Sequence, residues 1–376
     1  MTAAILQLIP RLDTGGAERT CIDVAAALAQ SGIRALVASE GGRLEEELRD
    51  KGAELIKLSM ASKSPARILA NARVLEKLIR THDVRLVHAR SRAPAWSGLI
   101  AARRANIPFV TTYHGFYSAR TPLKRWYNSV MVRGQAVIAN SQFTASHIET
   151  EYARRHARII TIPRGIDEDV FDPARVSARR IQSLRNYWGI GARDILVLLP
   201  GRLTRWKGQR ILIEAMAQLE MPGVKAVLAG DSQGRGAYEE ELSAAISGAG
   251  LDGRVIIAGH VSDMASAYMA ADIVVSCSIE PEAFGRVAAE AAAMGRPVIA
   301  TDHGGARETV ISGETGLLTP PGDATALAAA LNQLVAMGPE GRARLGEAGR
   351  RHILARFTRT RMCADTLRLY QELAQV

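Results

Sequence analysis

The stretch DIVVSCSIEPEAFGRVAAEAAAMGRPVIATDHGG, residues 272–305, joins two short apolar runs through a segment rich in glycine and alanine. The runs at 272–278 and 296–305 are rich in β-branched residues, which is typical of buried strands. The segment from about Phe284 to Met294 has the composition of a helix. A strand, a helix and a second strand in this order predict a βαβ unit with a right-handed crossover.

The same alternation of short apolar runs and amphipathic segments extends along most of the 376-residue chain. It stops in a charged segment around 167–193 and restarts at residue 194. At roughly 100–200 residues per domain, two domains are expected. The predicted strands lie at 4–10, 34–40, 54–59, 84–90, 108–115, 136–141 and 158–163 in the first half, and at 194–202, 224–231, 254–261, 272–278 and 296–305 in the second.

These patterns predict an α/β protein with two Rossmann-like domains, each an open parallel sheet. The last stretch, RTRMCADTLRLYQELAQV, has no strand after it and is expected to be a closing helix. The expected organisation is an N-terminal domain at 1–168, a linker at 169–193, a C-terminal domain at 194–358 and the final helix at 359–376.

The net charge of +10 is unevenly distributed. Residues 51–150 contain 16 Lys+Arg against 4 Asp+Glu, a balance of +12, so the remainder of the chain carries 10 − 12 = −2. An ordinary solvated basic face explains this excess, and so does a surface for an anionic partner. No nucleic-acid-binding motif accompanies the charge. An anionic membrane surface or a phosphorylated lipid acceptor fits it at least as well.

The three cysteines, Cys21, Cys277 and Cys363, are far apart and follow no metal-ligand spacing. An odd and sparse cysteine content favours a reducing compartment, so a cytoplasmic protein is expected. Its basic half would suit a peripheral position at the inner membrane.

Candidate ligand-binding residues follow the predicted strands, because ligands bind beyond the carboxyl ends of strands in open parallel sheets. Gly15 and Gly16 come after the first strand and open a helix, where backbone N–H groups can meet a ligand. A tight turn would also explain them. His114 follows the fifth strand and can contact a substrate hydroxyl, although a histidine satisfied by the local backbone is the alternative.

In the second half, the loop GRLTRWKGQ places Arg202, Arg205 and Lys207 between glycines. Cations in such a loop suit a diphosphate, whereas an exposed basic loop is the simpler interpretation. Glu282 and Glu290 stand eight residues apart. A carboxylate buried in an alanine-rich helix needs hydrogen-bond donors, which the two hydroxyls of a ribose can supply. Two surface glutamates with ordinary salt bridges are the alternative.

The combination of these motifs resembles the retaining glycosyltransferases of family 4, which have the GT-B fold. The resemblance rests on E-P-E-A-F-G-R-V-A-A-E at 280–290, G-R-L-T-R-W-K-G at 201–208, G-G-A-E at 15–18, T-Y-H-G at 112–115 and I-P-R-G-I-D at 162–167. It implies two domains facing a central cleft, with the C-terminal helix crossing back to the N-terminal domain. It also implies acceptor binding by the first domain and donor binding by the second.

The resemblance implies a role for each matching position. Glu290 would bind the donor ribose, and Glu282 would face the hydroxyls of the donor sugar. Arg202 and Lys207 would hold the diphosphate, which the loop of Gly15 and Gly16 approaches from the other domain. His114 would lie near the reacting end of the sugar. Backbone N–H groups would hold sugar and phosphate oxygens at Phe284, Gly285, Arg286 and Val287.

The expected activity is transfer of a hexose from a UDP- or GDP-sugar to a glycan or lipid-linked acceptor, with retention of the anomeric configuration. The diphosphate is expected to need no metal ion and no cofactor, since fixed cations would stabilise it. The stretch at 230–238 resembles members from lipopolysaccharide and surface-polysaccharide assembly. Arg164 replaces an asparagine that is frequent in the family, and no catalytic role is assigned to it. The alternatives are a nucleotide-sugar 2-epimerase of the same architecture and a non-enzymatic nucleic-acid binder.

Overall fold

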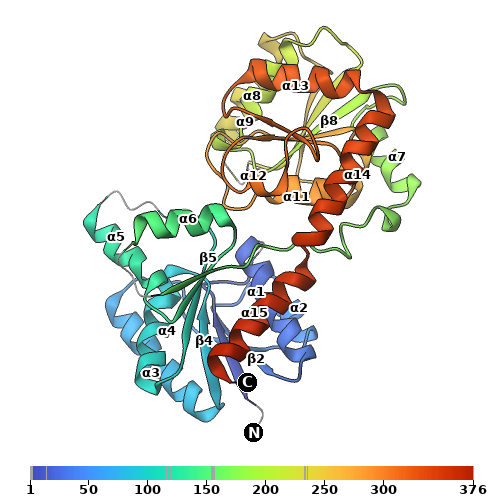
Figure 1. Cartoon of the computed structure of the whole chain (residues 1–376). Coiled ribbons are helices and arrows are strands. Elements are labelled where there is room, and N and C mark those ends of the chain that lie inside the picture. The colour runs from blue at the N-terminus through green and yellow to red at the C-terminus, as the bar shows by residue number, and fades with distance from the viewer. Residues whose placement is uncertain are drawn as a thin grey trace. The chain divides into compact units, whose positions relative to one another are not determined.

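The chain divides into two units. The first consists of residues 1–165 and 359–376, and the second of residues 166–358 (Figure 1). The computed structural model describes residues 3–13, 15–115, 117, 121–153, 157–232, 234 and 236–375.

Within these described residues, the first unit contains a seven-stranded sheet in the order β3-β2-β1-β4-β5-β6-β7, with all paired strands parallel. The strand order reverses between β1 and β4, where Leu8 is the register partner of Ala89. The strands are β1 (Ala4–Leu8), β2 (Arg34–Ser39), β3 (Glu54–Lys57), β4 (Val84–Ala89), β5 (Phe109–Tyr113), β6 (Ala136–Ala139) and β7 (Arg158–Thr161).

Helices cover both faces of this sheet. Leu6 and Leu8 of β1 join the core on one face, and Ile5 joins the core on the other. The second face includes Tyr370 of the C-terminal helix, which is completely buried. This helix therefore belongs to the first unit, as expected. The helices are α1 (Gly16–Gln30), α2 (Glu45–Asp50), α3 (Pro65–Thr81), α4 (Arg92–Ala105), α5 (Pro122–Asn128), η1 (Ser129–Val132), α6 (Gln142–Glu151) and α15 (Arg359–Ala374).

The second unit contains, in its described residues, a six-stranded sheet in the order β10-β9-β8-β11-β12-β13, again with parallel pairs. Here the order reverses between β8 and β11. The predicted fold of two parallel-sheet α/β domains is confirmed. The strands are β8 (Ile195–Pro200), β9 (Val224–Ala229), β10 (Val255–Gly259), β11 (Ile273–Ser276), β12 (Val298–Thr301) and β13 (Leu317–Thr319).

Residues 306–358 contain β13 and three helices, none of which the sequence pattern predicts. One of them, α14 (Gly338–Arg356), packs closely against the end of the alanine-rich helix α11 (Arg286–Ala293). A Cβ on Gly346 would lie only 2.1 Å from the carbonyl oxygen of Gly295, so glycine is needed there. The helices of this unit are η2 (Pro173–Arg175), α7 (Ala178–Tyr187), η3 (Arg205–Lys207), α8 (Gln209–Ala217), α9 (Gly236–Gly248), α10 (Met264–Ala270), α11 (Arg286–Ala293), α12 (Ala306–Thr309), α13 (Ala324–Ala336) and α14 (Gly338–Arg356).

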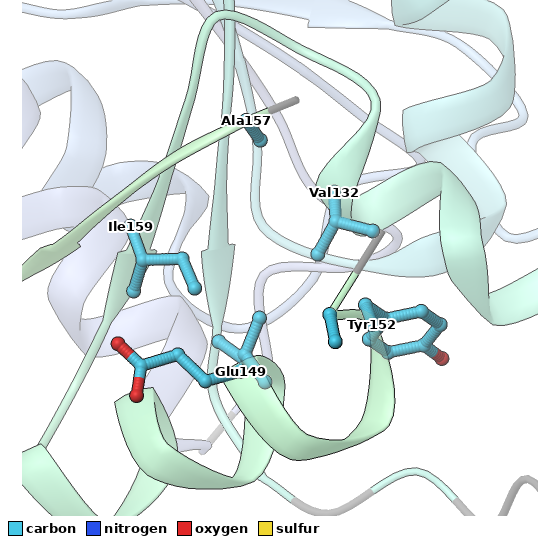
Figure 2. Close-up of a pocket in the computed structure, with 7 residues that line it drawn as sticks. Val132, Glu149, Tyr152, Ala157 and Ile159 are labelled. Atoms are coloured by element: carbon cyan, nitrogen blue, oxygen red, sulfur yellow. The ribbon is translucent and has the colours of Figure 1, made fainter. Parts of the chain in front are cut away.

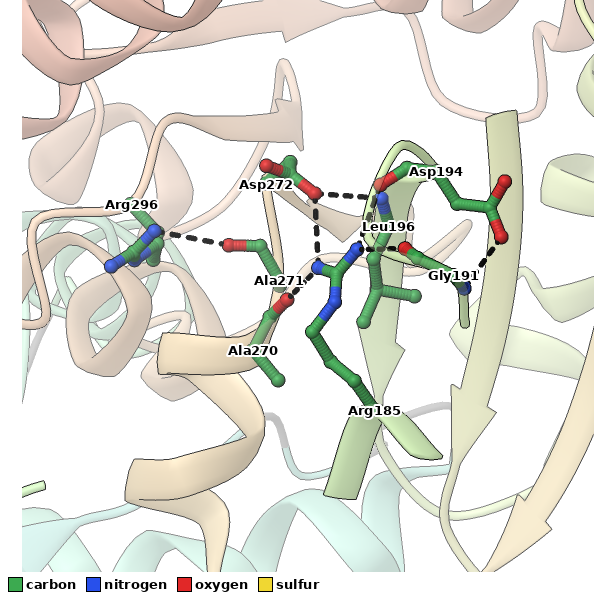
Figure 3. A network of polar contacts seen from close by, with 8 residues as sticks. All are labelled: Arg185, Gly191, Asp194, Leu196, Ala270, Ala271, Asp272 and Arg296. Carbon is green, nitrogen blue, oxygen red and sulfur yellow. Dashed lines mark hydrogen bonds and ion pairs between the residues drawn. The ribbon is translucent and has the colours of Figure 1, made fainter. Parts of the chain in front are cut away.

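The predicted linker at 169–193 differs from the structure, which builds these residues into the second unit. Trp188 and Ile190 are buried in its core, at 4% and 3% exposed. The guanidinium of Arg185, on α7, donates to the carbonyl oxygens of Ala270 at 2.7 Å and Asp194 at 2.7 Å (Figure 3). The charged composition of this segment therefore reflects a helix that is attached to the domain through a partly buried arginine.

Replacing Arg185 by Ala should destabilise the second unit. The change removes four hydrogen bonds, to Ala270, Asp272, Gly191 and Asp194, and leaves the carbonyl of the buried Ala270 without this donor. The expected loss is about 2 kcal/mol in the free energy of unfolding, measured by urea titration. Arg179→Ala, at an exposed position of the same helix, is the control and should change little. Equal stability of both variants would contradict a structural role for Arg185.

Candidate functional site

The carboxyl ends of β8 and β11 carry the candidate residues of the second unit. These two strands flank the point where the strand order reverses, and an open α/β sheet binds its ligands at such a point. The loop after β8 contains Arg202 and Lys207, and the loop after β11 contains Glu282. The topology thus brings together residues that lie 75 positions apart in the sequence.

An ion pair links the two loops. Lys207 Nζ lies 2.7 Å from Glu282 Oε1, and the side chains are only 12% and 16% exposed. Ser278 Oγ donates to the same carboxylate oxygen. Gly208 permits this approach, since its φ is +76° and a Cβ there would lie 2.0 Å from the carbonyl oxygen of Cys277. Two of the candidate residues, Lys207 and Glu282, are therefore in direct contact.

The N-cap of α11 follows Glu282 three residues later in the chain. Gly285 caps the helix in the left-handed conformation, with φ 82° and ψ 58°. Phe284 is 2% exposed, and its ring packs edge to face on Phe357 at 5.6 Å. Its side chain belongs to the core, so a contact with a ligand at this position has to come from the backbone. Val287 packs partly buried against the same core.

Glu290 is buried inside α11 but already has donors from the protein. It is 7% exposed, and Tyr268 Oη donates to its Oε2 at 2.9 Å. Arg286, one turn earlier, donates to Oε1 at 2.6 Å. Glu290 is therefore not a surface residue, whereas Glu282 is partly exposed and forms a salt bridge with Lys207. Burial and the neighbouring Glu290 raise the pKa of Tyr268 well above its usual value, which keeps the phenol protonated as a donor.

Sequence reasoning missed Tyr268 because the residue lies on α10, 22 positions away from Glu290. The pattern around it, MASAYMAAD, is that of an ordinary apolar helix. The one available signal was that a buried carboxylate requires a partner, and that requirement does not identify which residue provides it.

The three cations of the loop after β8 have separate surroundings. Lys207 pairs with Glu282, whereas Arg205 pairs with Glu241 at 2.6 Å. Arg202 is exposed, and its carbonyl oxygen accepts a hydrogen bond from Gln209 Nε2 at 2.8 Å. The structure therefore associates Lys207 with the glutamate site and directs Arg205 to an ion pair elsewhere. A diphosphate contact by Arg202 stays a prediction.

In the first unit, Gly16 and His114 meet at a residue to which the sequence assigned no role. Arg164 Nη2 lies 3.2 Å from His114 Nδ1. A Cβ on Gly16, the first residue of α1, would lie 2.5 Å from Arg164 Nη1. Gly15 is the N-cap of that helix, in extended conformation. The loops after β1, β5 and β7 therefore converge on one arginine.

A separate hollow lies between α6 and β7, lined mainly by apolar side chains with Glu149 and Tyr152 at its side (Figure 2). None of the candidate residues lines it. Residues 154–156, which stand between two of its lining residues in the sequence, fall outside the described part of the chain, so no function is assigned to this hollow.

The described residues contain no group of three or more His, Cys, Asp or Glu side chains arranged to hold a metal ion. Asp167, in the acidic triplet at 167–169, accepts hydrogen bonds from the backbone N–H groups of Asp169 and Val170. Among the helices of the described part, none is long and apolar enough to span a bilayer.

Two family models match the chain. The model of glycosyl transferases group 1 matches residues 181–352, and the model of glycosyltransferase family 4 matches residues 14–170. The D-inositol 3-phosphate glycosyltransferase of Xylanimonas cellulosilytica is 31% identical over 302 residues, covering 76% of this chain and 72% of the relative.

Solved structures with the same fold cover almost the entire chain. A glycosyltransferase from Rickettsia africae has a TM-score of 0.92 and 34% identity, over 99% of this chain and 98% of that structure. Anabaena HepE in complex with UDP-glucose has a TM-score of 0.82 and 30% identity, over 97% of this chain and 99% of that structure.

Replacing Tyr268 by Phe should destabilise the second unit by about 2 kcal/mol, because a buried carboxylate loses one of its donors. The change removes one oxygen atom and leaves the ring that packs on Phe171 at 5.9 Å. Urea unfolding measures the effect, with Tyr187→Phe, at a site 79% exposed, as the control. Unchanged stability of Tyr268→Phe would mean that Glu290 does not depend on this hydrogen bond.

Proposed function

Because the chain belongs to the group 1 glycosyltransferases, we propose that it transfers a hexose from a UDP- or GDP-sugar to a glycan or lipid-linked acceptor with retention of configuration. The observation that carries this proposal is the ion pair between Lys207 and Glu282 beside the amino end of α11. It combines a cation for a leaving diphosphate with a carboxylate for sugar hydroxyls at one sheet edge.

Lys207 is the group that stabilises the departing diphosphate. Its ammonium has three N–H donors, and one of them goes to Glu282. Two donors are left for phosphate oxygens, while Glu282 holds the ammonium in place. Arg202 and the backbone N–H groups at the start of α11 add positive potential. A fixed donor of this kind stabilises the developing charge by about 2.7–4 kcal/mol.

Glu282 and Glu290 bind the donor through hydroxyl groups. Both hydrogen bonds to Glu282 go to Oε1, so Oε2 accepts none from the described residues and is available to a sugar hydroxyl. Oε1 of Glu290 accepts two hydrogen bonds from Arg286, and Oε2 accepts one from Tyr268. A carboxylate has about four lone-pair sites, so Oε2 can still accept one hydroxyl of a ribose.

Retention is proposed to follow a front-face route. Glu282 is occupied by Lys207 and Ser278 and faces hydroxyls, so it is poorly suited to attack the anomeric carbon. The bond from the anomeric carbon to the phosphate oxygen breaks, the acceptor oxygen bonds to that carbon from the same side, and the departing phosphate takes the acceptor's proton. The anomeric coupling constant of the product in NMR tests this route, and an inverted product would exclude it.

A role in lipopolysaccharide or surface-polysaccharide assembly is the proposed context. The basic excess of residues 51–150 suits an anionic acceptor or the inner face of an anionic membrane. The stretch at 230–238 supports the same assignment, although its residues 233 and 235 lie outside the described part. A cytoplasmic position and independence from metals and cofactors belong to this proposal.

A nucleotide-sugar 2-epimerase is the second candidate, since it would need the same diphosphate and sugar contacts. Incubation of the protein with a nucleotide-sugar alone separates the two activities. An epimer formed without an acceptor would favour the epimerase, whereas transfer that requires an acceptor favours the glycosyltransferase.

Lys207→Ala should lower kcat by about 100- to 1000-fold with a smaller change in the donor KM, because the lost interaction strengthens as the leaving group gains charge. Lys225→Ala is the matched control, since Lys225 forms a comparable ion pair with Asp194 at 2.8 Å away from the candidate residues. Equal activity of the two variants in a transfer assay would refute the role of Lys207.

A panel of UDP, GDP and ADP should identify the donor base by thermal shift. A nucleotide at 100 times its Kd stabilises the folded protein by about 2.7 kcal/mol.

Glu290→Gln should weaken binding of the nucleotide that gives the largest thermal shift about tenfold, because a neutral amide accepts ribose hydroxyls less strongly than a carboxylate. The exposed Glu314→Gln is the control. Undiminished binding to Glu290→Gln would remove this residue from the site.

A further inference from the structure

We propose that the first unit contains a binding site for an anionic group, a phosphate or a carboxylate, on the acceptor, formed by Arg90, His114 and Arg164. The assignment of this anion to the acceptor rests on the proposed function above. The site deepens that function, because it specifies the charge of the molecule that receives the sugar.

Arg90 occupies the position of the first unit where a ligand is expected. It directly follows β4, beside the reversal of strand order between β1 and β4. The residue is only 2% exposed. Its Nε donates to Gln7 Oε1 at 2.7 Å, its Nη2 donates to the same oxygen, and Gln7 donates in turn to the carbonyl oxygen of Cys21. A neutral amide thus holds the guanidinium.

The surroundings of Arg90 do not neutralise its charge. Among the residues that the structure describes, no carboxylate forms an ion pair with it. Burial raises the pKa of the Cys21 thiol to about 11, and burial together with Arg90 lowers the pKa of His88 well below its usual value. Both groups are therefore neutral near pH 7. A buried charge is costly unless an opposite charge pairs with it, and the described residues supply no such partner for Arg90.

His114 presents a hydrogen-bond donor in the same place. A guanidinium can only donate, so His114 Nδ1, at 3.2 Å from Arg164 Nη2, is the acceptor and Nε2 carries the hydrogen. Nε2 is buried and has no partner among the described residues. Burial, Arg164 and Arg90 lower the pKa of His114, so the ring stays neutral and donates through Nε2.

These groups share one depression at the carboxyl edge of the sheet. Arg90, His114 and Arg164 line it together with Thr20 and Asn140. No acidic residue is among the described residues that line it. The hollow has room for one water-sized group, about 10 Å³, so these two guanidinium groups and the N–H donor suit a single oxygen of a phosphate or carboxylate whose other atoms stay outside it. Gly16 leaves room for Arg164, since a Cβ there would lie 2.5 Å from its Nη1.

Titration calorimetry with inorganic phosphate tests the site. The full chain carries Lys207→Ala and Arg202→Ala, so that the proposed diphosphate contacts of the second unit cannot hold the anion. Arg90→Met and Arg164→Gln should each weaken phosphate binding at least tenfold. Arg73→Gln, which removes one exposed charge from the same basic stretch, should leave it unchanged. Equal affinity of Arg164→Gln and Arg73→Gln would overturn the proposal, and that comparison holds even if Arg90→Met fails to fold.

The source of the anion is distinguished in separate titrations. Acetate tests a carboxylate and methyl phosphate a soluble phosphate, whereas vesicles containing phosphatidylglycerol test a lipid-borne phosphate. Each supports the site where binding depends on Arg164 but not on Arg73. The proposal would be overturned if none of these anions bound the parent chain. It would also be overturned if binding were the same in Arg164→Gln, in Arg73→Gln and in the parent chain.

Nucleotide binding separates this proposal from the proposed function. The thermal shift with the effective nucleotide should be the same in the wild-type chain and in Arg164→Gln. If Arg164→Gln lost nucleotide affinity as strongly as phosphate affinity, the anion would belong to the donor, and an acceptor site would be excluded. If no nucleotide bound the wild-type chain while phosphate still required Arg164, the anion site would stand and the proposed function would fail.

Discussion

The reversal of strand order in a parallel sheet is the constraint on which both candidate sites depend. Crossovers from β8 and β11 lead to opposite faces, so the loops after these strands separate and leave the carboxyl edge open. Only a close approach of the two loops can then place charged side chains together. Gly208, with its positive φ, allows that approach, and Lys207 reaches Glu282 as a result. The ion pair is a consequence of topology combined with one glycine.

The two units have charged residues at equivalent positions of their sheets, but the charge balance differs between them. At the reversal in the second unit, a lysine is compensated by a carboxylate from the neighbouring loop. At the reversal in the first unit, Arg90 is held by the amide of Gln7 and has no carboxylate partner among the described residues. The first arrangement is a charge-neutral ion pair. The second has a net positive charge in a buried position, and it can gain stability when an anion enters.

Much of the architecture was accessible from the sequence, because short β-branched runs separated by amphipathic segments have few alternatives to a parallel sheet. All twelve predicted strands correspond to strands of the two sheets. The three-residue β13 is too short for its pattern to stand out. The spacing of Glu282 and Glu290 identified these glutamates as candidate site residues. The contacts of Tyr268 with Glu290 and of Arg164 with His114 could be found only from the structure. Both are contacts between distant elements, which local patterns do not encode.

The return of α15 to the first unit makes that unit discontinuous in the sequence. Tyr370 and Leu369 cover an apolar face of a sheet whose strands were all synthesised before residue 166. During translation, this face stays uncovered until the whole second unit has been made. The nascent first unit therefore exposes an apolar surface while nearly two hundred further residues are synthesised. A chaperone could bind that surface during this period.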